Sequence, residues 1–145
     1  MDDKTVALLN EVSKNTEMGK NTVRQLLTMT DDASMRHHLQ KQLRTYEDLS
    51  RRAHAMLAVE GALPKEQSSV TKIGAQLGIK VQTLRDSSPQ KLAEMLIEGS
   101  HMGVTEITKA LKSAEGTQVN AGAVALAQRL QAAENQYADE LTSFL

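Results

Sequence analysis

Apolar residues recur at alternating spacings of three and four along four long stretches of this 145-residue chain, and this spacing constrains the fold most. It gathers apolar side chains on one face of an α-helix. The same stretches are rich in alanine, leucine, glutamine, glutamate and lysine, which favour helices. No convincing run alternates polar and apolar residues between turn residues, as a strand would. The sequence therefore predicts an all-α fold with a single domain over residues 1–145.

The first two predicted helices form a hairpin over residues 4–60. They are expected at about residues 4–28 and 32–59. The link between them, Thr30-Asp31-Asp32, is short and rich in residues that cap helix N-termini. The second helix must therefore turn back antiparallel to the first. Gly61 and Pro64 are expected to end it.

The last two predicted helices form a second hairpin over residues 88–145. Ser88 is a good N-cap, and Pro89 suits the first helical turn, where its missing N–H costs nothing. That helix is expected to reach about Ser113. Gly116 indicates its C-terminal cap, and Thr117 is expected to be the N-cap of the final helix.

A long connector, residues 61–87, joins the two hairpins. Several of its apolar residues keep helical spacing, although Gly74 and Gly78 weaken the pattern. We expect one helix, or two short helices, packed along the bundle. Four long helices with two short links and one long crossover are the layout of ferritin-like four-helix bundles.

The second hairpin is predicted to repeat the first about a pseudo-twofold axis. The first and third helices align on Met18-Gly19 and Met102-Gly103. The second and fourth align on Glu47 and Glu134, which pairs Leu39 with Leu126 and Leu43 with Leu130. Each hairpin thus presents a similar stripe to the other.

The matched glycines and methionines of this repeat need separate explanations. A glycine inside a helix costs up to ~1 kcal/mol relative to alanine. Gly19 and Gly103 are therefore expected to permit close approach of the first and third helix backbones. Met18 and Met102 are expected to point away from the apolar stripes, which makes them candidates for a subunit contact or for covering by the connector.

Four parts of the chain carry a resemblance to a known family: Asn15 to Gly19, Ile79 to Leu84, Ala93 to Gly103 and the last helix around Glu134. They resemble segments of small, uncharacterised ferritin-like proteins of bacteria. This resemblance implies a ferritin-like bundle in a branch whose biochemical role is generally unassigned.

Ferritin-like metal centres take a glutamate from each of two helices and Glu-x-x-His from each of the other two. Residues three apart share a helix face, so the two ligands converge. In this chain Glu47 is followed by Ser50 and Glu134 by Tyr137, so both histidines are missing. Hydroxyl residues also stand at the best-centred polar positions of the first and third helices. The expected ligand set is largely absent, and no metal or other cofactor is expected.

A residual single-metal site remains the alternative. Its candidate ligands are Glu47, Glu134, Glu17 and His101. Glu17 and His101 lie about 100° or more from the centres of their stripes, so they are expected to face solvent or a neighbouring subunit. Glu47 and Glu134 are expected to flank the core. Four hydroxyl residues are expected to form a hydrogen-bonded layer there: Thr16, Ser50, Ser100 and Tyr137.

The composition of the chain limits the chemistry, the binding partners and the cellular location that can be expected. The chain has no cysteine, which excludes thiol chemistry and suits a reducing cytoplasm. The formal net charge is −1, which gives nucleic-acid binding little support. No apolar run approaches the roughly 20 residues of a membrane span, and Met1-Asp2-Asp3-Lys4 lacks the layout of a signal peptide. A cytoplasmic location is expected.

No residue pattern specifies a catalytic centre, so the chain is not expected to be an enzyme. The leading hypothesis is a non-catalytic ferritin-like scaffold or protein-interaction module of unassigned process. It is expected to form a homodimer or larger homo-oligomer and to bind an unknown protein partner. The alternative is a metal-binding or oxidative-stress protein with a reduced, single-metal site.

Overall fold

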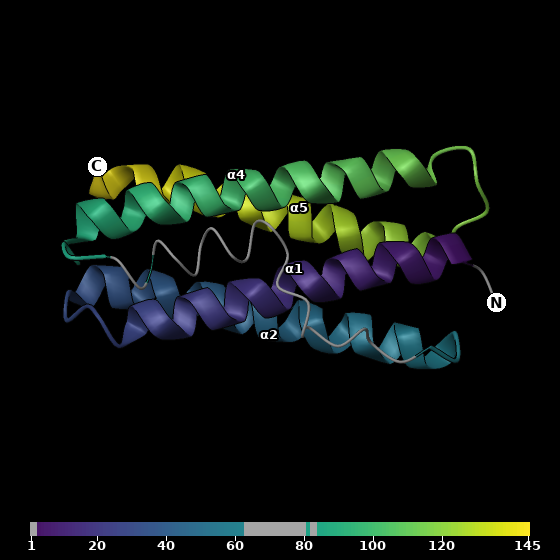
Figure 1. Cartoon of the computed structure of the whole chain (residues 1–145), viewed down its shortest axis with the longest axis horizontal. Coiled ribbons are helices and arrows are strands. Elements are labelled where there is room, and N and C mark those ends of the chain that lie inside the picture. The colour runs from purple at the N-terminus through teal and green to yellow at the C-terminus, as the bar shows by residue number, and fades with distance from the viewer. Residues whose placement is uncertain (1–2, 63–80, 82–83) are drawn as a thin grey trace.

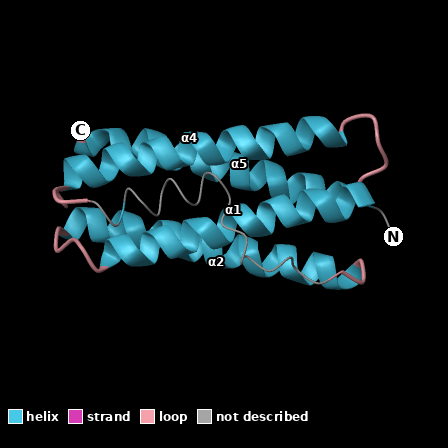
Figure 2. Ribbon diagram, in the orientation of Figure 1, coloured by secondary structure: helices cyan, strands magenta, loops and turns pink. Residues whose placement is uncertain are grey.

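The computed structural model describes residues 3–62, 81 and 84–145 of the chain. These residues form four α-helices and a short 3₁₀ helix: α1 Asp3–Leu27, α2 Ala33–Val59, α4 Pro89–Ala114, α5 Ala121–Leu141 and η1 Thr142–Phe144. Within the described residues there is no strand (Figure 2). The predicted all-α four-helix bundle is confirmed.

Helices α1 and α2 form one antiparallel hairpin, and α4 and α5 form the other (Figure 1). Helix α2 ends at the end of the bundle where α1 begins, whereas α4 begins at the opposite end. The two helix ends on either side of residues 61–87 are therefore separated by the length of the bundle. The question of one or two connector helices falls on residues 63–80 and 82–83, which lie outside the described residues. Val81 is buried in the core.

Two of the predicted helix starts have the expected caps. The carboxylate of Asp32 accepts a 2.9 Å hydrogen bond from the backbone N–H of Met35. The hydroxyl of Ser88 accepts one from the N–H of Lys91 at 3.3 Å, and Pro89 occupies the first turn of α4. Each cap satisfies a donor that the first helical turn leaves free.

The predicted start of the last helix at Thr117 is wrong. Asn120 caps α5, because its side-chain oxygen accepts from the N–H groups of Gly122 and Ala123. The Thr117 hydroxyl instead donates to the carbonyl of Ala114 at the end of α4. Gly116 has φ +74°, so it lies in the left-handed region and ends α4 as expected of a glycine there.

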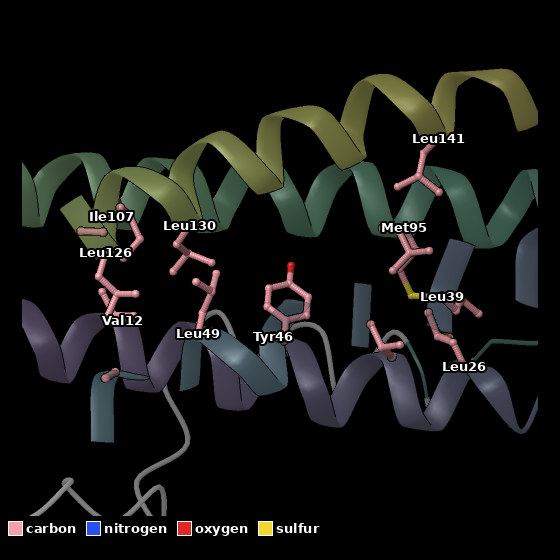
Figure 3. Packing of buried hydrophobic residues seen from close by; sticks show 14 of the residues in the cluster. Val12, Leu26, Leu39, Tyr46, Leu49, Met95, Ile107, Leu126, Leu130 and Leu141 are labelled. Carbon is pink, nitrogen blue, oxygen red and sulfur yellow. The ribbon is translucent and has the colours of Figure 1, made fainter. Parts of the chain in front are cut away.

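The core runs along the bundle axis and receives apolar side chains from all four helices. Figure 3 shows Tyr46 between two groups of apolar residues. Val12, Leu49, Ile107, Leu126 and Leu130 lie on one side, and Leu26, Leu39, Met95 and Leu141 on the other. The ring hydroxyl of Tyr46 is directed towards α5. The apolar core is therefore interrupted at its centre by a polar atom.

The buried positions of α2 and α5 follow one spacing. All eight buried residues of α5 lie 88 positions after a buried residue of α2. This register pairs Tyr46 with Glu134 and Leu39 with Ala127. The predicted alignment of Glu47 with Glu134 is thus one residue out of register with the buried faces. The internal repeat itself stays a prediction.

No helix within the described ranges is both long enough and apolar enough to cross a membrane.

Candidate functional site: a central polar cluster

Glu134 of α5 is the one acidic residue that is buried among the described residues, with 3% of its surface exposed. Each of its carboxyl oxygens accepts a hydrogen bond from the other hairpin. The amide of Asn15 in α1 donates to Oε1 at 3.1 Å, and the hydroxyl of Tyr46 in α2 donates to Oε2 at 3.0 Å. We call Asn15, Tyr46 and Glu134 the central polar cluster.

Two glycines make room for this cluster. A Cβ atom added at Gly103 would lie 2.5 Å from Oε2 of Glu134, and one added at Gly19 would lie 2.7 Å from the Tyr46 ring. Both distances are too short for real Cβ atoms. Gly19 therefore accommodates a side chain from α2, and Gly103 accommodates one from α5.

The predicted reason for these glycines is consequently revised. We expected the backbones of α1 and α4 to meet at Gly19 and Gly103, but the nearest atoms to both are side chains from the other helix of the same hairpin. One contact does join α1 and α4 here. The amide of Asn15 donates to the carbonyl of Gly103 at 3.3 Å, in addition to its bond with Glu134.

The electrostatics of the cluster favour a neutral carboxyl. Burial raises the pKa of Glu134, and the hydrogen bonds from Tyr46 and Asn15 lower it only in part, leaving a pKa of about 8. The pKa of Tyr46 is raised well above its usual value by burial and then by Glu134. At neutral pH both side chains are therefore predominantly uncharged.

A cavity of about 30 Å³ borders the cluster between α1 and α4. Its polar lining consists of the cluster together with Thr22, Gln42 and Ser100, and Met18 and Met95 contribute apolar lining. Because one water needs about 10–15 Å³ of such space, the cavity has room for about two. Among the described residues, none that lines it carries a positive charge.

The four candidate metal ligands are not brought together. Glu134 is central, but Glu47 and His101 are exposed. Glu47 therefore does not flank the core, because the neighbouring Tyr46 takes the inward position. Within the described part of the chain, no group of three or more histidine, cysteine, aspartate or glutamate residues could hold a metal ion.

Glu17 does not face open solvent as expected. Its carboxylate accepts a 2.7 Å hydrogen bond from Ser50 of α2 and pairs with Lys20 at 2.7 Å. Burial alone would raise the pKa of Glu17, but Lys20 and Ser50 outweigh it and lower the pKa. Glu17 is thus part of the α1–α2 contact, with both partners already in place.

The expected layer of mutually bonded hydroxyls is also wrong. Thr16 donates to backbone carbonyls of its own helix, those of Val12 and Ser13. Ser50 donates to Glu17, and Tyr137 donates to Thr45. Ser100 is buried and lines the cavity. Thr16, Ser50 and Tyr137 therefore each bond to a partner outside this set of four hydroxyl residues.

Sequence reasoning missed Asn15 and Tyr46 as members of the site. Tyr46 lies on the buried face of α2, and a buried tyrosine hydroxyl generally needs a partner. That requirement was the available signal. Asn15 stands beside the stripe residue Thr16, and nothing in its local sequence identifies Glu134 as its partner, 119 positions away.

Met18 and Met102 occupy different environments although they were matched in the sequence. Both are half-buried. Met18 lines the cavity beside the central polar cluster. Met102 borders a shallow groove on α4 together with Ile97, His101 and Thr105. The interface role of both methionines stays a prediction.

Comparisons with protein-family models, with curated proteins and with solved structures find no match to this chain.

Proposed function

We propose that this chain is a non-catalytic ferritin-like scaffold or protein-interaction module. The observation that supports this proposal is the bonding of Glu134. Both of its oxygens accept from the neutral donors Asn15 and Tyr46, and no second acid or histidine of the described residues lines the adjacent cavity. A ferritin-like metal centre needs several converging carboxylates and histidines. A single, mainly neutral carboxyl is a poor substitute for that set.

In this proposal the centre of the bundle is structural, and its function resides on the surface. We place the protein in the cytoplasm as a homodimer or larger homo-oligomer that also binds a further protein. The cysteine-free composition suits a reducing compartment. The half-buried Met102 supports an interface on α4, because methionine adapts its shape readily at contact surfaces.

The molar mass in solution tests the interface. We expect multi-angle light scattering at micromolar concentration to give at least a dimer for the wild-type chain. Met102→Glu should lower that mass, because it places a charge in the contact. Gln128→Glu is the matched control, since it adds the same charge at an exposed position of α5 and should leave the mass unchanged. A monomeric wild type that also retains no protein from a lysate would contradict the proposal.

A single-metal protein is the second candidate, and one observation favours it. Glu134 borders a cavity that is also lined by the hydroxyl-bearing residues Ser100 and Tyr46, so a carboxyl and further oxygen-bearing side chains lie around one small space. Oxygen donors suit iron or manganese. If Fe²⁺, Mn²⁺ or Zn²⁺ raises the melting temperature of the wild type but not of Glu134→Gln, this second function replaces the first.

A further inference from the structure

The central polar cluster connects all four helices through a few contacts. Glu134 of α5 bonds to Asn15 of α1 and to Tyr46 of α2. Asn15 also bonds to the Gly103 carbonyl of α4. The bond from Asn15 to the Gly103 carbonyl joins α1 directly to α4. The hydrogen bond in the contact between α1 and α4 is therefore made by an amide that Glu134 helps to orient.

An ionised carboxylate at this place would have little compensation. The side chains that α1 and α4 bring to the cavity wall near it include Asn15 and Ser100, which are neutral. Helix α2 brings Tyr46, which is titratable, and Gln42, which is neutral. No lysine, arginine or histidine of the described residues lines the cavity. Because an unpaired buried charge is costly, ionisation must recruit water.

The cavity is the route by which water can reach Glu134. It lies between α1 and α4, and its volume of about 30 Å³ admits about two waters. Full hydration of a carboxylate needs more than two waters. We expect further water to enter as α1 and α4 move apart around this cavity, with loss of the bond between Asn15 and Gly103.

We propose that Glu134 is a proton-operated latch on the contact between α1 and α4. In its protonated form it holds the contact closed. When it loses its proton, water enters the cavity and the two helices separate locally while the hairpins remain folded. The pKa of about 8 for Glu134 puts this change in the mildly alkaline range. The latch is independent of whether the chain is a scaffold or binds a metal.

A single engineered thiol can report the opening, because the chain has no cysteine of its own. Ser100→Cys places a thiol of similar size on the cavity wall. Its rate of reaction with a small neutral disulfide is followed from about pH 6 to pH 9.5. The matched control is the double variant Ser100→Cys, Glu134→Gln. It carries the same thiol, but the glutamine at position 134 cannot ionise.

We expect the two rates to be similar below about pH 7. Above about pH 8.5 the thiol should react about tenfold faster in the chain that keeps Glu134 than in the chain that carries Glu134→Gln. This ratio corresponds to about 1.4 kcal/mol of easier opening. A rate ratio that stays constant across this range would overturn the proposal. Ser100→Cys with Glu47→Gln is the control for loss of an exposed negative charge. Its thiol should react as fast as that of Ser100→Cys alone at every pH.

Hydrogen exchange of the chain without the thiol gives a second test, which holds even if Ser100→Cys fails to fold. Exchange is compared between wild type and Glu134→Gln at about pH 6.5 and pH 9, after correction for the intrinsic rate. We expect the wild type alone to lose protection at the higher pH, and chiefly in residues 12–23 of α1 and 95–107 of α4. An equal loss in all four helices would indicate general destabilisation and would contradict a local latch.

Discussion

The hydroxyl of Tyr46 donates a 3.0 Å hydrogen bond to Glu134 across the two hairpins, from positions that correspond in the buried faces of α2 and α5. A tyrosine and a mainly neutral glutamic acid thus meet at the centre of the bundle. The pair is held by neutral donors and enclosed by Gly19 and Gly103. Most predictions below follow from this geometry.

Tyr46→Phe should destabilise the fold, because it leaves Oε2 of a buried carboxyl without its donor. We expect a loss of about 1–3 kcal/mol in the free energy of unfolding, measured by urea denaturation followed by circular dichroism. Tyr137→Phe is the matched control: it also removes a phenol hydroxyl, but one that bonds to the half-exposed Thr45. It should cost less. Equal stability of wild type and Tyr46→Phe would show that the bond is unimportant.

Gly103→Ala should destabilise the fold although alanine favours helices. The added Cβ would lie 2.5 Å from the Glu134 carboxyl, which must shift and lose its bonds. We expect a net loss of about 1–3 kcal/mol, after the gain of up to ~1 kcal/mol in helix propensity.

Gly122→Ala provides the comparison for Gly103→Ala. The atoms nearest to an added Cβ at Gly122 are the Asn120 Oδ1 that caps α5 and the Met56 methyl, at 3.0 and 3.1 Å, so the Cβ meets flexible side-chain ends and no buried carboxyl. Gly122→Ala should cost less than Gly103→Ala, and at most about the 1 kcal/mol of a weakened cap. If both variants unfold at the same urea concentration, the close fit of Glu134 against Gly103 is wrong.

Glu134→Gln should alter how stability depends on pH. The pKa of Glu134 is raised from 4.5 to about 8, so its protonated form contributes stability that is complete below about pH 4.5 and is lost as the pH rises through about 8. The contribution is on the order of 5 kcal/mol. Glutamine keeps the size of the side chain but cannot ionise.

The measurement is the difference in melting temperature between Glu134→Gln and wild type from about pH 5 to pH 9. We expect it to increase with pH, because only the wild type loses stability from this site. The buried His38, whose pKa is lowered by burial, is present in both proteins and cancels in the difference. Glu47→Gln should show a constant difference, since Glu47 is exposed. A constant difference for Glu134→Gln would contradict a buried neutral carboxyl.

The fold was largely predictable, because apolar spacing averages over many residues of each helix. The error at the start of α5 arose where two competent cap residues, Thr117 and Asn120, stand close together. Only the structure shows that Thr117 bonds back to Ala114 while Asn120 caps the next helix.

The site was less predictable, because it depends on the direction in which each single side chain points from its helix. Neighbouring positions on a helix differ by about 100°, so an alignment one residue out of register pairs Glu134 with Glu47 instead of Tyr46. Acidic residues are also rarely buried without partners. The partners of Glu134 come from helices 88 and 119 positions away, beyond the reach of any local pattern.

The metal content of the purified chain tests the central claim most directly, because the claim is that Glu134 bonds to neutral side chains in place of a metal centre. Tag-free protein is analysed as purified and again after anaerobic loading with ferrous iron and desalting. We expect less than about 0.1 metal per chain in both samples. A stoichiometric metal that is lost in Glu134→Gln and kept in Glu47→Gln would contradict the account and establish a metalloprotein.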